Sequence, residues 1–214
     1  EEEYMLCDPS TGNLINKADD IMSNLPNNMK DRFSYELILS EIEVNTPICN
    51  SVDDALLKTI ELRNITKKLG SKLGFKIGIS GTHPDALAEE QQFVNSPNYK
   101  WVADQLGFYA RRNITFALHI HVAVPNEKLA IQATNGLRRW IPALLSLSAN
   151  SPLFEGNITG MKSSRTMQFG SFPRTNIPQT LASFQDYENL VKAYIKTYKV
   201  EAIISNCCNN YGPN

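Results

Sequence analysis

Residues 114–124 follow the period of a β-strand more closely than any other part of this 214-residue sequence. Every second residue is apolar, in the order Phe116, Leu118, Ile120, Val122 and Val124. His119 and His121 leave the opposite face beside two small residues, Ala117 and Ala123, which give the imidazoles room. Two histidines two residues apart on a strand can bind one metal ion, although a histidine in a strand is also often a hydrogen-bonded core residue. The pattern therefore predicts a sheet and offers a candidate metal site on it.

Acidic residues mark two further predicted strands. Glu1 and Glu3 lie at the start of the first, residues 3–7. They are two apart and share a face, so their carboxylates can converge on one cation; a solvated acidic terminus is the alternative. Residues 32–45 form the second predicted strand, in which Glu41 and Glu43 share a face and Glu36 precedes them. An exposed sheet face is the alternative there. Carboxylates with few histidines suit Mg²⁺ or Mn²⁺ better than Zn²⁺.

Helices are expected over four ranges of the sequence. The first, to Lys72, has Ser51 as its N-cap. The others are 99–112, 128–149, in which Pro142 should bend or restart the helix, and 187–198. Further strands are expected at 75–80 and 200–204. We therefore predict a single α+β domain over 1–214, with a mostly antiparallel sheet and helices packed on one face.

Residues 150–181 are expected to form a loop long enough to carry function. Arg165 lies there between hydroxyl residues, and Arg174 follows Pro173. Guanidinium groups bind carboxylates and phosphates with two parallel hydrogen bonds, although both could be ordinary surface arginines. The sequence has no GxxxxGK or GxGxxG motif, so a bound nucleotide would need metal ions and arginines to hold its phosphates.

Composition excludes several classes of protein. Lys and Arg number 21 against 22 Asp and Glu, and a net charge of −1 gives no overall attraction to nucleic acid or to an anionic membrane. No apolar run is long enough to span a bilayer. The four cysteines show neither metal-ligand spacing nor the density of a disulfide scaffold, which favours a cytoplasmic location.

Seven short runs, in this order, resemble the signatures of the glutamate-cysteine ligase type 2 family, also called carboxylate-amine ligases. They cover nearly the whole chain up to about Tyr198. The runs are Glu1-Glu2-Glu3-Tyr4, Glu43-Val44-Asn45-Thr46, Gly81-Thr82-His83-Pro84, His119-Ile120-His121-Val122, Leu147-Ser148-Ala149-Asn150-Ser151-Pro152, Ser164-Arg165-Thr166 and Phe172-Pro173-Arg174.

The resemblance implies a glutamine-synthetase-like catalytic domain that uses ATP and Mg²⁺ (or Mn²⁺). A glutamate-like carboxylate would attack the γ-phosphate of ATP, and an amine would then attack the acyl phosphate. It also implies the roles of individual residues. The implied metal ligands are Glu1, Glu3, Glu36, Glu43, His119 and His121. Arg165 is the implied catalytic residue, and the implied substrate-binding residues are Arg165, Arg174, Thr82 and His83.

One feature of this resemblance conflicts with the strand pattern. Glu36 and Glu43 are seven residues apart, and an odd spacing places them on opposite faces of a regular strand. If both bind metal, residues 32–45 must contain a bulge or a twist.

Two other functions remain open from the sequence. Family members continue beyond this point with a further acidic ligand and a catalytic arginine, and the residues after Tyr198 do not resemble that continuation, so we expect a C-terminally truncated domain. Such a domain could be catalytically inactive and act only in binding or in homo-oligomer formation through exposed strand edges. A metal-dependent hydrolase built on His119, His121 and the carboxylates is the third candidate.

Overall fold

The computed structural model describes residues 1–170, 172, 175 and 177–198. Contacts within the chain divide it into two compact units. The first consists of Glu1–Ile120 and Ala149–Arg174, and the second of His121–Ser148 and Thr175–Asn214. The predicted strand at 200–204 and the predicted anion-binding Arg174 lie outside the described residues.

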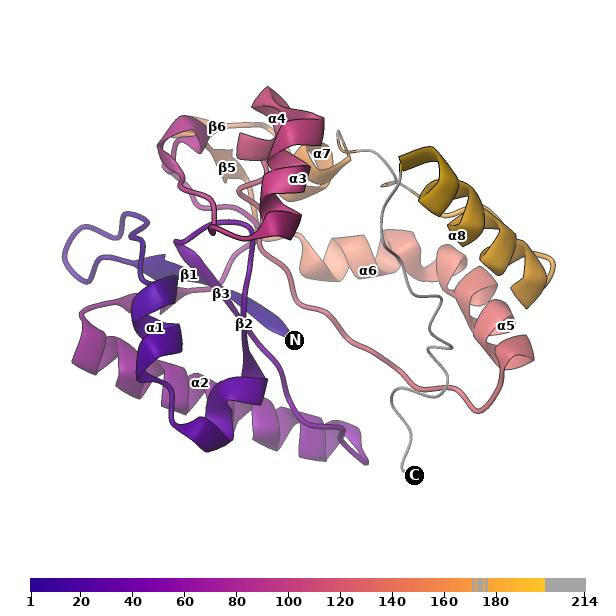
Figure 1. Cartoon of the computed structure of the whole chain (residues 1–214), viewed down its shortest axis with the longest axis horizontal. Helices are drawn as coiled ribbons and strands as arrows, with labels where there is room; N and C mark the ends of the chain where they lie inside the picture. Colours follow the sequence, from indigo (N-terminus) through magenta and orange to yellow (C-terminus); the bar gives the residue numbers. More distant parts are fainter. Residues whose placement is uncertain (171, 173–174, 176, 199–214) are drawn as a thin grey trace. The chain divides into compact units, whose positions relative to one another are not determined.

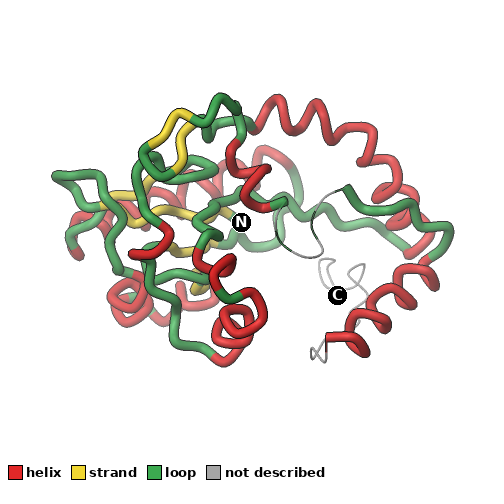
Figure 2. The backbone as a smooth tube through the Cα atoms, turned by 90° about the horizontal axis from the view of Figure 1, so that it is seen from above, coloured by secondary structure: helices red, strands yellow, loops and turns green. Residues whose placement is uncertain are grey.

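The first unit contains a four-stranded antiparallel sheet. Its strands are β1 (Glu2–Cys7), β2 (Phe33–Tyr35), β3 (Glu41–Val44) and β4 (Lys76–Gly78), in the order β2-β3-β1-β4. All three pairings are antiparallel. The strands are short and form a small part of the chain, as the yellow segments in Figure 2 show. The predicted α+β class with a mostly antiparallel sheet is confirmed.

Two helices cover one face of this sheet, α1 (Ala18–Asn24) and α2 (Val52–Leu73) (Figure 1). The predicted N-cap of α2 is confirmed, because the Ser51 hydroxyl accepts a hydrogen bond from the Asp54 N–H at 3.1 Å. Gly74 ends the helix in the left-handed conformation, with φ 78°. The core between these helices and the sheet consists of Tyr4, Leu6, Ala18, Ile21, Leu25, Phe33, Ile42, Val44, Leu62 and Phe75.

A second, smaller core lies on the other face of the sheet. Met5 and Phe116 are buried in it, and Tyr99 and Val102 of α3 (Pro97–Leu106) pack against it. The predicted helix 99–112 is divided in two, because Gly107 (φ 53°) has a non-helical conformation between α3 and α4 (Phe108–Arg111). Helices are therefore not confined to one face. Short 3-10 helices occur at Asn27–Arg32 and Ala88–Glu90.

The single strand predicted over residues 32–45 is wrong. The segment forms two antiparallel neighbours, β2 and β3, in which Ser34 lies opposite Glu43. Residues 37–39 between them make hydrogen bonds with residues 92–94, with 2.8 Å from the Leu39 nitrogen to the Gln92 oxygen and 3.0 Å from the Val94 nitrogen to the Leu37 oxygen. Because the chain reverses here, neither a bulge nor a twist is needed to bring Glu36 and Glu43 to one face.

The strand predicted over residues 114–124 is also wrong. The segment makes only isolated bridges, Thr82 to Thr115 and Glu2 to Leu118, and it runs on as loop towards α5 (Figure 1). Leu118, Ile120 and Val122 are 64–79% exposed. Alternation indicates which side chains would share a face, but a strand also needs neighbours along its edges. Within the described residues this segment finds one over only a few positions.

The predicted long loop contains some regular structure. Strands β5 (Leu153–Phe154) and β6 (Asn157–Ile158) form a hairpin, and α7 (Ser164–Phe169) follows.

The second unit is helical. Its helices are α5 (Glu127–Leu137), the 3-10 helix Arg138–Trp140, α6 (Ile141–Ser148) and α8 (Phe184–Tyr198). The predicted interruption at Pro142 is confirmed by the 3-10 turn before it. The Ser183 hydroxyl caps α8 by accepting a hydrogen bond from the Asp186 N–H at 3.2 Å. In the part of the chain that the structure describes, no helix combines the length and the apolar character that crossing a bilayer requires.

Candidate functional site

Register places carboxylates together on the sheet face opposite α1 and α2. Tyr4 and Leu6 of β1 and Ile42 and Val44 of β3 point towards the helices, so the alternate residues point the other way. Glu3 lies directly opposite Glu43, and Met5 opposite Glu41. The predicted shared faces of Glu1 with Glu3 and of Glu41 with Glu43 follow from this register.

Glu36 reaches the same group from the end of β2. It lies two residues beyond Ser34, which is opposite Glu43, so its side chain leaves the same face. Oxygen atoms of Glu3, Glu36 and Glu43 lie within 4.8 Å of one another. Glu1, Glu43 and His119 form a second set with ligand atoms within the same distance. Glu43 belongs to both sets, and we call these five residues the acidic cluster.

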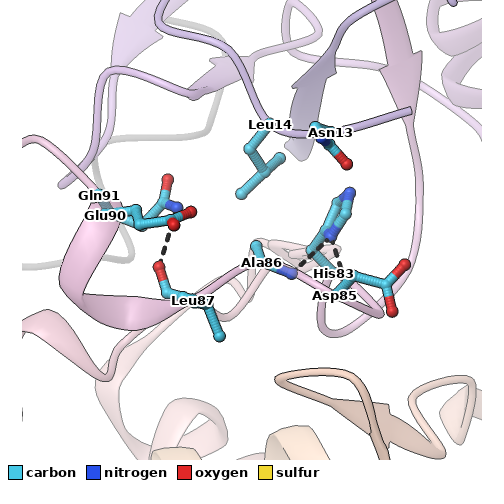
Figure 3. A pocket seen from close by; sticks show the side chains of 8 residues that line it. All are labelled: Asn13, Leu14, His83, Asp85, Ala86, Leu87, Glu90 and Gln91. Atoms are coloured by element: carbon cyan, nitrogen blue, oxygen red, sulfur yellow. Dashed lines mark hydrogen bonds between the residues drawn. The ribbon is translucent and has the colours of Figure 1, made fainter. Parts of the chain in front are cut away.

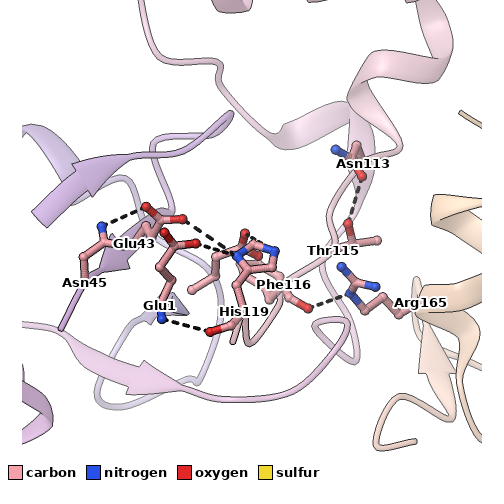
Figure 4. A network of polar contacts seen from close by, with 9 residues as sticks. Glu1, Glu43, Asn45, Asn113, Thr115, Phe116, His119 and Arg165 are labelled. Carbon is pink, nitrogen blue, oxygen red and sulfur yellow. Dashed lines mark hydrogen bonds and ion pairs between the residues drawn. The ribbon is translucent and has the colours of Figure 1, made fainter. Parts of the chain in front are cut away.

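His119 joins the cluster through backbone hydrogen bonds to the start of β1. The Glu1 nitrogen donates to the His119 oxygen at 3.0 Å, and the His119 nitrogen donates to the Glu1 oxygen at 3.0 Å (Figure 4). The imidazole Nδ1 is then 3.2 Å from Glu1 Oε2 and 4.0 Å from Glu43 Oε2, and Nε2 is 3.8 Å from Glu3 Oε1. His121 belongs to the second unit, so its role as a metal ligand stays a prediction.

Burial and mutual repulsion make the acidic cluster costly to ionise fully. Burial, and then the charges of Glu3 and Glu43, raise the pKa of Glu36 to about 8. Burial also raises the pKa of Glu3, and the charge of Glu43 adds to this, although His119 and Arg165 act in the opposite direction. A divalent cation would relieve this repulsion.

Glu41 is a further carboxylate of this face that the resemblance did not identify. It is 3% exposed, and its Oε1 has no hydrogen-bond partner among the described residues. Burial and the charges of Glu3, Glu36 and Glu43 raise its pKa well above the ordinary value. Its spacing of two from Glu43 had already predicted that it shares this face, although the resemblance gave it no role.

Arg165 acts electrostatically on these acids, because its charge acts to lower the pKa of both Glu3 and Glu41. Its Nε donates to the Phe116 oxygen at 2.8 Å, and its guanidinium carbon lies 4.9 Å from the centre of the Phe169 ring. Burial lowers the pKa of Arg165, while the charges of Glu3 and Glu41 act to raise it. A partly buried guanidinium held by one nitrogen can use its remaining N–H groups to orient an anion.

Thr82 and His83 are buried, and their side chains bond to backbone groups. The Thr82 hydroxyl donates to the Leu153 oxygen at 2.7 Å. His83 Nδ1 accepts from the Asp85 and Ala86 N–H groups at 3.2 and 3.0 Å, so Nε2 is the donor to the Gly12 oxygen at 2.9 Å. These bonds fix the conformation of the loop that carries both residues. A direct contact of either side chain with substrate stays a prediction.

His83 also lines a polar pocket of about 300 Å³ (Figure 3). Asp85 and Glu90 supply carboxylates to its wall, and the Gln91 side-chain amide donates to the Leu87 oxygen. Its lining contains no member of the acidic cluster and no arginine. The pocket is therefore separate from the groups that can hold a divalent cation.

The fold and this site define an α+β protein whose sheet presents a cluster of carboxylates and one histidine that could hold a divalent cation, with an arginine that acts on it electrostatically. Comparison with known protein families identifies one family: the model of the glutamate-cysteine ligase family 2 matches residues 1–201. The chain belongs to this family, as the ordered motifs predicted.

Curated relatives agree with this assignment. The chain is 38% identical over 196 residues to a Rubrobacter xylanophilus protein named "Putative glutamate--cysteine ligase 2-1". The match covers 92% of this chain and 52% of the relative. Proteins named "Putative glutamate--cysteine ligase 2" from Herpetosiphon aurantiacus and Solibacter usitatus are 32% and 34% identical, over 94% and 98% of this chain and 52% and 53% of their own lengths. The chain thus spans about half the length of the curated relatives it matches.

Proposed function

We propose that this chain supplies the cation site and an anion-orienting arginine of an ATP-dependent carboxylate-amine ligase. The observation that carries the proposal is the convergence of Glu1, Glu3, Glu36, Glu43 and His119 on one sheet face in a chain of the glutamate-cysteine ligase family 2. The proposed substrates are a glutamate-like carboxylate, an amine and ATP, and the proposed catalytic fold is glutamine-synthetase-like.

The residues of the acidic cluster fit Mg²⁺ or Mn²⁺. Carboxylate oxygens dominate both donor sets, and hard divalent cations prefer oxygen ligands. Glu41 adds a buried oxygen without a partner among the described residues, next to the same sets. Glu3, Glu36 and Glu43 would hold one ion, and Glu1, Glu43 and His119 would provide a second position. A bound Mg²⁺ would offset the charge of the ATP phosphates during transfer.

In the proposed reaction, the substrate carboxylate attacks the γ-phosphate of ATP, ADP leaves, and the amine displaces phosphate from the acyl phosphate. Neither step needs a covalent bond to the protein, so positioning and charge are the main contributions of its side chains. Arg165 would orient the acidic substrate or a phosphate through the N–H groups not used by Phe116. Arg174, Thr82 and His83 are further proposed contacts of the substrate.

The first test is calorimetric titration of the chain with Mn²⁺, with Glu43→Gln and Glu61→Gln compared at equal concentration. We expect Mn²⁺ binding that Glu43→Gln weakens and Glu61→Gln leaves unchanged, because Glu61 pairs with Lys58 on α2 at 3.0 Å. The second test measures ADP release by the protein that carries this sequence over its full natural length, with ATP, Mg²⁺, glutamate and a panel of amines. ADP release that no amine increases would exclude the ligase.

A further inference from the structure

Glu2 lies between two ligands of the acidic cluster but points the other way. It is 7% exposed and faces α2, where Arg63 binds it with both arms of the guanidinium. Arg63 Nε donates to Glu2 Oε2 at 2.8 Å, and Arg63 Nη2 donates to Glu2 Oε1. The Tyr4 hydroxyl also donates to Glu2 Oε2. A carboxylate held by this number of donors has little freedom to rotate or shift.

The backbone of Glu2 is also where the ligand-bearing segments meet. Glu2 lies opposite Val44 on one side and bridges to Leu118 on the other. Each neighbour adjoins a ligand, Glu43 and His119 respectively. Glu1 and Glu3 are the chain neighbours of Glu2 itself. The position of the Glu2 backbone therefore affects four members of the acidic cluster, Glu1, Glu3, Glu43 and His119.

Repulsion within the cluster acts against this arrangement. Glu2 and Val44 form the last pair of the β1–β3 ladder, and Glu3 faces Glu43 in the pair next to it. A strand end carrying like charges tends to separate from its neighbour, and a shift of one residue would send Glu1 and Glu3 to the helix side. Arg63 opposes both movements, because it binds β1 from the helix side at that last pair.

We propose that Arg63 is a positioning residue for the cation site: by holding Glu2, it sets Glu1, Glu3, Glu43 and His119 at ligand distance from one another. This proposal deepens the proposed function and rests on it for the identity of the ligand. Arg63 touches neither cation nor substrate, and its effect passes through the backbone of β1.

The test compares variants of the full chain. Arg63→Met alone leaves a buried carboxylate unpaired and can prevent folding, so the main variant is the double substitution Glu2→Met with Arg63→Met, which replaces the pair by apolar side chains. Arg63→Lys keeps the charge without the two-armed geometry. The matched control is Arg112→Met, which removes an arginine of similar exposure that pairs with Glu155 at 3.4 Å in the same unit.

Two readouts are needed, the Mn²⁺ dissociation constant by calorimetry and the hydrogen exchange of two amides. The Glu3 amide donates to the Ala117 oxygen and the His119 amide to the Glu1 oxygen. We expect the double variant to keep a wild-type melting temperature, to bind Mn²⁺ at least tenfold more weakly, and to exchange both amides faster. Arg63→Lys should fall between the double variant and wild type, and Arg112→Met should match wild type in both readouts.

Wild-type Mn²⁺ affinity and wild-type exchange in the double variant would overturn the proposal, because Arg63 would then only stabilise the fold. If the wild-type chain binds no Mn²⁺, the proposed function fails. In that case the amide exchange alone decides whether Arg63 holds this end of β1.

Discussion

Glu3 and Glu43 lie directly opposite each other on neighbouring antiparallel strands and on the same face of the sheet. Like charges in this position destabilise a sheet. The pair is therefore a cost to the metal-free fold, one that a bound cation would remove. This links the stability of the protein to the occupancy of the acidic cluster.

Glu43→Gln should remove most of the stabilisation that Mg²⁺ or Mn²⁺ gives. In the wild type, an ion well above its dissociation constant should raise the free energy of unfolding by about 1–3 kcal/mol. The variant should be slightly more stable than the wild type without metal, because one of the repelling charges is gone, while the amide oxygen can still accept from Asn45. Thermal melts with and without metal measure both effects. Glu61→Gln is the control, and equal metal-induced shifts in Glu43→Gln and wild type would show that the acids form no metal site.

The stability of the metal-free protein should fall as pH rises from about 5 to about 8. The pKa of Glu36 is raised from 4.5 to about 8, so over this range the folded protein keeps a proton that the unfolded chain releases. Stability then decreases with rising pH. The loss should be about 3–4 kcal/mol, since the shift covers nearly three pH units of this range and each pKa unit corresponds to about 1.4 kcal/mol. Denaturant unfolding in EDTA at several pH values measures it, and Glu36→Gln should flatten the dependence. An unchanged slope in the variant would mean that Glu36 ionises normally in the folded protein.

Arg165→Lys should weaken binding of the acidic substrate and leave Mn²⁺ binding intact. Lysine cannot reproduce both the bond to the Phe116 oxygen and a two-armed contact with an anion. We expect KM for the carboxylate substrate to rise about tenfold. Steady-state ADP release by the full-length protein tests this, with Arg111→Lys on the exposed side of α4 as the matched control. Equal KM values in Arg165→Lys and wild type would remove Arg165 from the substrate site.

Gly81→Ala should destabilise the first unit. A Cβ at this position would lie 3.0 Å from Ser151 Oγ, 3.1 Å from Asn150 Oδ1 and 3.2 Å from Arg165 Cβ. Crowding of this kind typically costs about 1–3 kcal/mol. Gly136→Ala in α5 is the matched control and should be stabilising by up to about 1 kcal/mol, because nothing lies within 4 Å of its added Cβ and alanine favours the helix. Chemical denaturation compares the two, and a Gly81→Ala variant as stable as wild type would contradict the close approach of this loop to Arg165.

The sequence alone was sufficient to predict the features that depend on residues close together in the chain. The Ser51 cap, the interruption before Pro142 and the shared face of Glu41 and Glu43 depend on local hydrogen bonds, ring geometry and the two-residue period of a strand. The ordered motifs were also sufficient to predict the family, since they are independent of how the chain folds.

Features that join distant residues required the tertiary structure. Alternation in 114–124 could not show that, within the part of the chain that the structure describes, the segment has edge partners at only a few positions, which leaves Leu118 and Ile120 exposed. The spacing of Glu36 and Glu43 could not reveal the chain reversal that brings them together, because pairing with residues 92–94 holds the turn. The sequence also could not identify Arg63 as the partner of Glu2, which lies 61 residues away along the chain. Local sequence sets which side chains share a face, whereas register and long-range pairing depend on the burial and hydrogen bonding of the whole unit.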